Sequence, residues 1–334
     1  MPARRRTLAF GLAAQAAAMA ALRAAAAQGS GDAGEYPDRP IRVVVGFAAG
    51  GATDITTRTM APKLQALLGQ PIVVENRAGA GGNVATEQVV RAAPDGYTLL
   101  MGTVAALAIN PTLHKSLPFD PQSDLSPISL SGEVLNVLAV PADRPWRDLR
   151  ELVAAAKARP NTLTYGSSGV GGAGHLAGAL LDRMAGIQTV HVPYRGGGAL
   201  ITDLVSGKVD FAFATAATTL PHVESGRLRV LAVPTAARSS LLPEAPTVAE
   251  GGGLPGYEVA NWYALLGPKG LPRPVVDRLN AAMRSTLQHA EVVQLLAKHG
   301  VEPRPSSPEE LARFMREETA KWAPIVRASG ATVD

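Results

Sequence analysis

Hydrophobic residues along this chain fall into a repeated order of strand, glycine-rich loop and helix. The β-branched run 41–45 predicts a buried strand, a small-residue loop follows it, and from Thr53 onward the apolar residues recur with helical spacing. Residues 163–178 repeat the same plan. The pattern therefore indicates two similar halves, each beginning with a strand, a glycine loop and a helix.

The remaining periodic segments continue this order in both halves. Strands are predicted at 71–76, 97–103, 127–130 and 135–141, then at 189–192, 209–213, 229–233 and 262–268, and helices at 84–92, 148–158, 174–185, 199–206 and 274–289. This alternation predicts an α/β fold with two mixed, mainly parallel sheets flanked by helices. We expect chain crossings near 135–141 and 262–268, and strand ends that face one cleft able to close by hinge motion.

The glycine loops predict anion binding. The first N–H groups of a helix have no partner inside it, and glycines let a ligand approach them closely. One helix N-terminus contributes only about 0.3–1 kcal/mol, rising to about 2 when partly buried, so a useful site needs loops from both halves. Residues 194–198, Tyr-Arg-Gly-Gly-Gly, are a third candidate loop, in which Arg195 is either a charge complement for an acid or a solvated surface charge.

Other chemistries find little support. Residues 169–174 match G-x-G-x-x-G, but the next strand carries no acid for a ribose, which disfavours a dinucleotide. The chain has no cysteine, and no pair of its 6 histidines has the helical spacing of a metal site beside an acid. We therefore expect neither a cofactor nor a metal.

Several polar residues in the loops leave two interpretations open. His175 either donates to an anion or is a helix-start residue bonded to backbone, whereas Asp54 is expected to cap its helix or order water rather than bind ligand directly. Thr53, Ser167 and Ser168 are either helix caps or ligand donors.

The N-terminus predicts export. Residues 1–27 carry three consecutive arginines, an Ala/Leu-rich run and three alanines, which is typical of a signal peptide cleaved near Ala27; an N-terminal membrane helix is the weaker alternative. The four arginines of this segment account for the whole net charge of +4. With 4% aromatic residues as well, a nucleic-acid partner is not expected.

From residue 36 to the C-terminus, the chain resembles the extracytoplasmic receptors of tripartite tricarboxylate transporters, the Bug-type binding proteins. The segments that carry the resemblance are 49–54, 74–83, 94–99, 175–178, 191–197, 203–204, 207, 209–210 and 245–250. The resemblance implies a two-lobed type II periplasmic binding protein without catalytic activity, with residues 36–135 plus 251–334 as lobe 1 and 136–250 as lobe 2. It also implies a monomer that delivers a small organic carboxylate to integral-membrane transporter subunits.

In similar proteins, loops of both lobes hold a ligand carboxylate. Carried onto this chain, the implied ligand contacts are Ala49, Gly51, Thr53, Asp54, Thr103, Ser167, Ser168, Gly172, His175, Tyr194, Gly196, Gly197 and Thr215. Family members often have an acid where this chain has Ala214, which weakens an amino-acid ligand and favours a carboxylate with an uncharged aliphatic or aromatic remainder. The ligand class that the resemblance implies is a dicarboxylate, a tricarboxylate or an aromatic acid. The alternatives are a ligand-sensing receptor for a signalling partner and a secreted enzyme that uses Asp54 and His175.

Overall fold

The computed structural model describes residues 36–329, so the expectations for residues 1–27 lie outside it. Within this range, the first sheet has the strand order β11 (Val301–Pro303), β4 (Leu125–Val134), β10 (Trp262–Pro268), β3 (Thr98–Thr103), β1 (Ile41–Val45) and β2 (Ile72–Asn76). The second sheet has the order β7 (Val190–Pro193), β6 (Thr164–Ser167), β8 (Phe211–Thr215), β5 (Asn136–Pro141) and β9 (Leu228–Ala232). The expected α/β fold with two sheets is confirmed.

The two sheets share one strand pattern. The order β2-β1-β3-β10-β4 in the first sheet corresponds to β7-β6-β8-β5-β9 in the second, as the repeated segments in the sequence predict. The parallel pairs are β1–β2, β1–β3, β6–β7 and β6–β8, whereas β3–β10, β4–β10, β4–β11, β5–β8 and β5–β9 are antiparallel. The sheets are therefore mixed, as expected, with antiparallel pairs where the crossing strands β5 and β10 meet their neighbours.

The chain crosses between the sheets where the sequence predicts it. Only Leu135 separates β4 of the first sheet from β5 of the second, and β10 returns the chain to the first sheet after β9. Beside these crossings, the Asn261 side-chain amide donates to Asn136 Oδ1 at 3.2 Å, and Val134 N donates to Asn261 O at 2.8 Å. The two crossing segments are thus held together by side-chain and backbone bonds.

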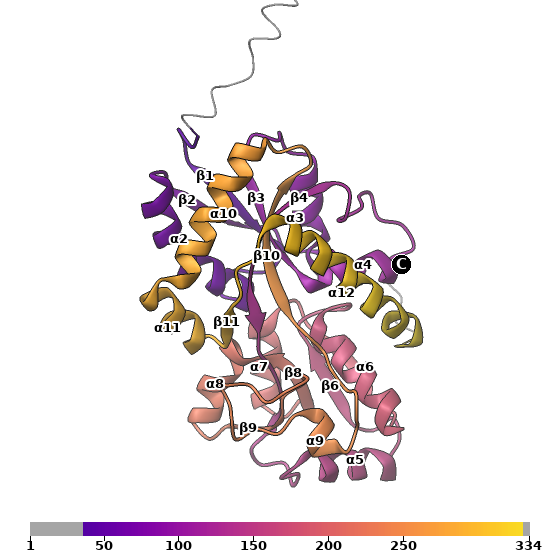
Figure 1. Cartoon of the computed structure of the whole chain (residues 1–334). Helices are drawn as coiled ribbons and strands as arrows, with labels where there is room; N and C mark the ends of the chain where they lie inside the picture. Colours follow the sequence, from indigo (N-terminus) through magenta and orange to yellow (C-terminus); the bar gives the residue numbers. More distant parts are fainter. Residues whose placement is uncertain (1–35, 330–334) are drawn as a thin grey trace, which may run out of the picture. The chain divides into compact units, whose positions relative to one another are not determined.

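Helices cover the strands. Around the first sheet lie α2 (Ala52–Leu68), η1 (Ala80–Gly82), α3 (Asn83–Val90), η2 (Ala105–Ile109), α4 (Asn110–Leu113), α10 (Arg273–Gln288), α11 (Ala290–Lys298) and α12 (Pro308–Ser329) (Figure 1). With the second sheet lie α5 (Leu149–Ala158), α6 (Ala173–Ala185), α7 (Gly197–Val205), α8 (Ala216–Glu224) and α9 (Val248–Gly252). None of the helices in the described part of the chain has the length and apolar character needed to cross a bilayer.

Strand alternation places the core on both faces of the second sheet. In β5, Leu138 and Val140 belong to one buried cluster, whereas Val137 and Ala139 belong to another. The first cluster also contains Val44 of β1, so one apolar core runs from the first sheet to the second. This shared core fixes the strand ends that carry the loops described next.

Candidate functional site

A cavity of about 860 Å³ lies between the loops of the two sheets. Its wall is formed after β1, β2 and β3 by residues 46–53, 78–81 and 103–105, and after β6, β7 and β8 by residues 168–170, 172–174, 193–200 and 213–215. These loops follow the carboxyl ends of parallel strands, which is the usual ligand position in open α/β sheets. The volume suits a small organic ligand.

Ten of the expected contact residues lie on this wall. They are Ala49, Gly51, Thr53, Thr103, Ser168, Gly172, Tyr194, Gly196, Gly197 and Thr215. The Oγ1 atom of Thr103 is buried and has no hydrogen-bond partner among the described residues. Asp54, Ser167 and His175 do not line the cavity, so the geometry does not support direct contact for these three.

Besides α8, which follows the wall residue Thr215 and also lacks a side-chain cap, three α-helices begin at the cavity with a glycine N-cap and no side-chain cap. They are α2 after Gly51, α6 after Gly172 and α7 after Gly196. Their first-turn residues, including Thr53 and Gly174, also line the cavity. Because first-turn N–H groups have no partner within an α-helix, all three N-termini offer donors and the positive end of the helix dipole to a ligand.

The loops before α2 and α6 have matching backbones. Gly50 and Gly171 both have φ +76°, a conformation that favours glycine, and each precedes the glycine N-cap. Gly51 N donates to Ala48 O at 3.2 Å, and Gly172 N donates to Gly169 O at 3.3 Å. The first sheet and the second therefore present similarly shaped anion loops.

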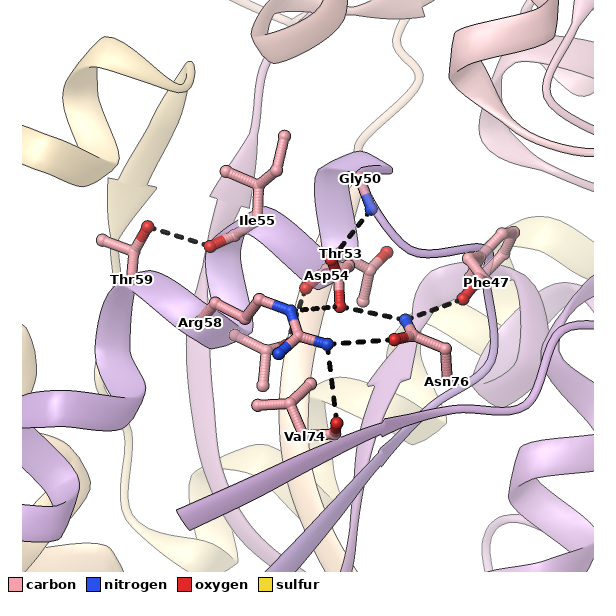
Figure 2. A network of polar contacts seen from close by, with 10 residues as sticks. Phe47, Gly50, Thr53, Asp54, Ile55, Arg58, Thr59, Val74 and Asn76 are labelled. Atoms are coloured by element: carbon pink, nitrogen blue, oxygen red, sulfur yellow. Dashed lines mark hydrogen bonds and ion pairs between the residues drawn. The ribbon is translucent and has the colours of Figure 1, made fainter. Parts of the chain in front are cut away.

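Asp54 lies behind the first loop and holds it in place. Its buried carboxylate accepts hydrogen bonds from Gly50 N at 2.9 Å, Arg58 Nε at 2.9 Å and Asn76 Nδ2 at 3.0 Å (Figure 2). Asn76 Nδ2 also donates to Phe47 O at 3.0 Å. The indirect role inferred from the residues agrees with this geometry, because both carboxylate oxygens are used inside the protein.

His175 and Ser167 lie behind the second loop. His175 Nδ1 accepts from Gly171 N at 3.1 Å, and the His175 ring stacks on His191 with 3.9 Å between centroids. Ser167 Oγ lies 2.7 Å from His191 Nε2 and donates to Gly169 O at 2.9 Å. Of the two interpretations of His175, this geometry agrees with the helix-start residue bonded to backbone.

Burial keeps both rings of this pair neutral at pH 7. It lowers the pKa of His175 to about 4, and burial followed by the neighbouring His175 ring lowers the pKa of His191 to about 3. His175 thus supplies an acceptor to its loop and no positive charge to the ligand site. Ser167 and His191 are close enough for a nucleophile and its base. However, Ser167 is fully buried and does not line the cavity, so its hydroxyl is not presented to a ligand there.

The electrostatics of the cavity favour an anion. Among the described residues that line it there is no aspartate or glutamate, and Arg195 is the only one ionised at neutral pH. Burial lowers the pKa of His114 and raises the pKa of Tyr263 to about 12, so both stay neutral and can form hydrogen bonds. The wall is therefore positive or neutral throughout.

Four polar wall residues escape the sequence argument: His114, Asn136, Asn261 and Tyr263. None lies in a glycine loop. Asn136 lies within one predicted crossing and Asn261 directly precedes the other, so the crossing strands themselves are the signal that points to them. For His114, which follows the short helix α4, we find no sequence signal.

Comparisons with known proteins place these features in a wider group. Residues 56–331 match the family model described as tripartite tricarboxylate transporter family receptor. Protein BugT of Bordetella pertussis is 37% identical over 297 residues, which is 89% of this chain and 91% of that protein.

Two solved structures are similar over nearly the same length. R. palustris Rpa4515 with adipate has a TM-score of 0.85 and 34% identity, covering 88% of this chain and 98% of that chain. MatC (Rpa3494) from Rhodopseudomonas palustris with bound malate has a TM-score of 0.82 and 33% identity, covering 87% of this chain and all 100% of that chain.

Proposed function

We propose that this chain, which belongs to the tripartite tricarboxylate transporter receptor family, binds a small dicarboxylate between its two sheets and presents it to a membrane transporter. The family consists of periplasmic solute receptors. The observation that carries the proposal is the convergence of three α-helix N-termini with glycine N-caps on one cavity whose described wall has no acidic residue. Such a wall repays the desolvation of an anion with charge-assisted hydrogen bonds.

The placement of these N-termini favours a ligand with two anionic ends. Helix α2 approaches the cavity from the first sheet, and α6 and α7 approach it from the second. A hydrogen bond to a charged group is worth about 1.5–3 kcal/mol, so binding at both ends plus burial of the ligand's carbon chain reaches the roughly 8 kcal/mol of a micromolar complex. The relatives with adipate and malate, both dicarboxylates, support this class.

Engagement of both sheets also predicts closure of the receptor on its ligand. A ligand held by the loop of one sheet alone gains little, whereas a ligand that bridges both loops stabilises the closed arrangement. The closed form is the one that a transporter subunit would distinguish from the empty receptor.

Titration calorimetry on ligand-free protein tests the ligand class. Adipate and hexanoate form a matched pair with the same carbon chain, and we expect hexanoate, which has one carboxylate fewer, to bind at least tenfold more weakly. Glutamate should also bind weakly, because no described wall residue offers a counter-charge to its ammonium group. Equal affinity for adipate and hexanoate would contradict two-ended binding, and failure of malate, citrate, benzoate and both chain acids to bind would contradict carboxylate binding altogether.

Delivery to a transporter needs a separate test. Cross-linking of the ligand-loaded receptor in membranes of the source cell should capture transporter subunits, and capture should fall when the ligand is removed. Capture of a membrane-bound sensor in their place would support the signalling alternative.

A further inference from the structure

The two anion loops are held by the same kind of bond but by different side chains. Asp54 and His175 are each the third residue of their helices, and each accepts a hydrogen bond from the backbone N–H four residues earlier, Gly50 at 2.9 Å and Gly171 at 3.1 Å. A carboxylate holds the loop of the first sheet, and an imidazole holds the loop of the second.

The surroundings explain why the two side chains differ. Arg58, four residues after Asp54, donates to that carboxylate and neutralises it. The matching position in α6, four residues after His175, is Ala179, which offers no charge. A carboxylate at position 175 would be buried without a cation and would lie beneath the helix N-terminus that faces the ligand.

We propose that His175 is a positioning residue, which holds loop 168–172 in its anion-binding shape by accepting from Gly171 N as a neutral ring. The proposal rests on the proposed function only for its effect on ligand affinity. The hydrogen bond itself belongs to the ligand-free protein and is testable there.

Acid should release this bond. The titratable groups around the ring are His191 of β7, whose ring is stacked on it, Tyr165 of β6, whose hydroxyl donates to His175 O at 3.2 Å, and Asp182 further along α6, whose charge acts on Tyr165. Protonation turns Nδ1 from an acceptor into a donor, so the bond from Gly171 N is lost as the pH falls through the folded-state pKa of about 4.

The effect on folding has the same direction. The folded-state pKa lies below the ordinary value of 6.5, so the unfolded chain takes up a proton first as the pH falls. The contribution of the neutral ring to stability is therefore complete above about pH 6.5 and is lost between there and about pH 4.

A variant series at pH 7 with adipate as the probe tests the affinity effect. His175→Ala removes the acceptor and should weaken binding at least tenfold. His175→Asn supplies a neutral oxygen at the position that corresponds to the Asp54 carboxylate in the other loop, and it should bind within about threefold of the wild type. His175→Asp keeps an acceptor but adds an unpaired charge, so it should bind more weakly than the Asn variant, and adding Ala179→Arg should recover part of the loss. His289→Asn, on a histidine that does not line the cavity, is the control and should leave affinity unchanged.

Nuclear magnetic resonance of the ligand-free protein tests the bond directly. In a titration from pH 7 to pH 3.5, the chemical shift of the Gly171 amide should change together with that of the His175 ring. In His175→Ala the Gly171 amide should lose this pH dependence and should exchange faster with solvent. If the wild type binds no carboxylate but this amide still follows His175, the proposed ligand class is wrong and the positioning role stands. A Gly171 amide that ignores His175, or an Asn variant no better than the Ala variant, would overturn the positioning role.

Discussion

Helices α5 and α6 follow each other in the chain but begin in opposite ways. The N-cap of α5 is Asp148, whose carboxylate accepts from Glu151 N at 2.9 Å, and Glu151 in turn accepts from Arg147 N at 2.7 Å. The N-cap of α6 is Gly172, which has no side chain to cap the helix. One helix satisfies its first turn internally, and the other leaves its first turn open to the cavity.

The comparison extends to other helices. Thr247 and Glu250 form a complete capping box at α9, away from the cavity, whereas α2 and α7 begin at the cavity with uncapped glycines. Helices α10 and α11 also lack a side-chain cap, so an uncapped start alone does not mark a site. What distinguishes the cavity helices is that three α-helices with uncapped glycine starts meet around one space.

Glycine N-caps at the site cost the protein little folding stability. Replacing a capping Ser, Thr, Asp or Asn by alanine costs about 0.5–2 kcal/mol, but replacing it by glycine costs only a few tenths. Glycine N-caps therefore keep the first-turn donors free for a ligand at a small loss of folding free energy.

Giving α6 the cap of α5 should have the largest effect. In Gly172→Asp the new Cβ would meet Gly169 O at 3.4 Å, an ordinary contact, and the backbone at φ −71° and ψ 160° suits an aspartate N-cap. The new carboxylate would accept the first-turn N–H groups and repel the ligand, so we expect affinity for adipate to fall at least 100-fold, by roughly 2.7 kcal/mol or more.

The melting temperature of this variant should stay within about 2 °C of the wild type, since the cap gains only a few tenths of a kcal/mol. Gly172→Ala, which adds only a methyl group, is the matched control and should lose less than about tenfold in calorimetry. Binding by Gly172→Asp within threefold of the wild type would show that the α6 N-terminus does not contact the ligand.

Charge at the start of α7 should have the next largest effect. Capped helices carry acids in the first turn, Glu151 in α5 and Glu250 in α9, whereas α7 follows the exposed Arg195. A cation beside a helix N-terminus is unfavourable unless an anion joins them. Arg195→Glu should therefore weaken adipate binding about tenfold, and Arg195→Gln about threefold, mainly through slower association.

Stopped-flow association rates at low and high salt test whether Arg195 speeds association of the ligand. The wild-type rate should fall as salt rises, and the Arg195→Gln rate should depend on salt less steeply. Identical salt dependence in both proteins would exclude Arg195 from ligand capture.

How much of this could be predicted from the sequence depends on the range of the interactions. Runs such as 41–45 and the glycine loops carry their structure locally, so the strands and the helix starts follow from them, whereas the full set of ten wall residues comes from the family resemblance. The direction of the strands does not follow from local patterns, because the antiparallel pairing of β10 with β3 joins segments far apart in the chain.

The roles of Asp54 and His175 show the same limit. Their spacing places both in the first helical turn, but whether they face the ligand or the backbone depends on Gly50 and Gly171, whose positive φ turns the N–H toward them. Likewise Tyr263 reaches the cavity from a crossing strand and not from a loop, so no local motif identifies it.

Removing the cap of α5 should have the smallest effect, and on folding alone. Asp148→Ala leaves Glu151 N without its acceptor and should lower the free energy of unfolding by about 1 kcal/mol, whereas Asp148→Gly should lower it by only a few tenths. Neither variant should change affinity for adipate, because Asp148 does not line the cavity. Urea unfolding measures the stability of both variants, and calorimetry measures their affinity for adipate. A loss of affinity in either variant would mean that capped and uncapped helices are coupled, so that a cap stabilises more than its own helix.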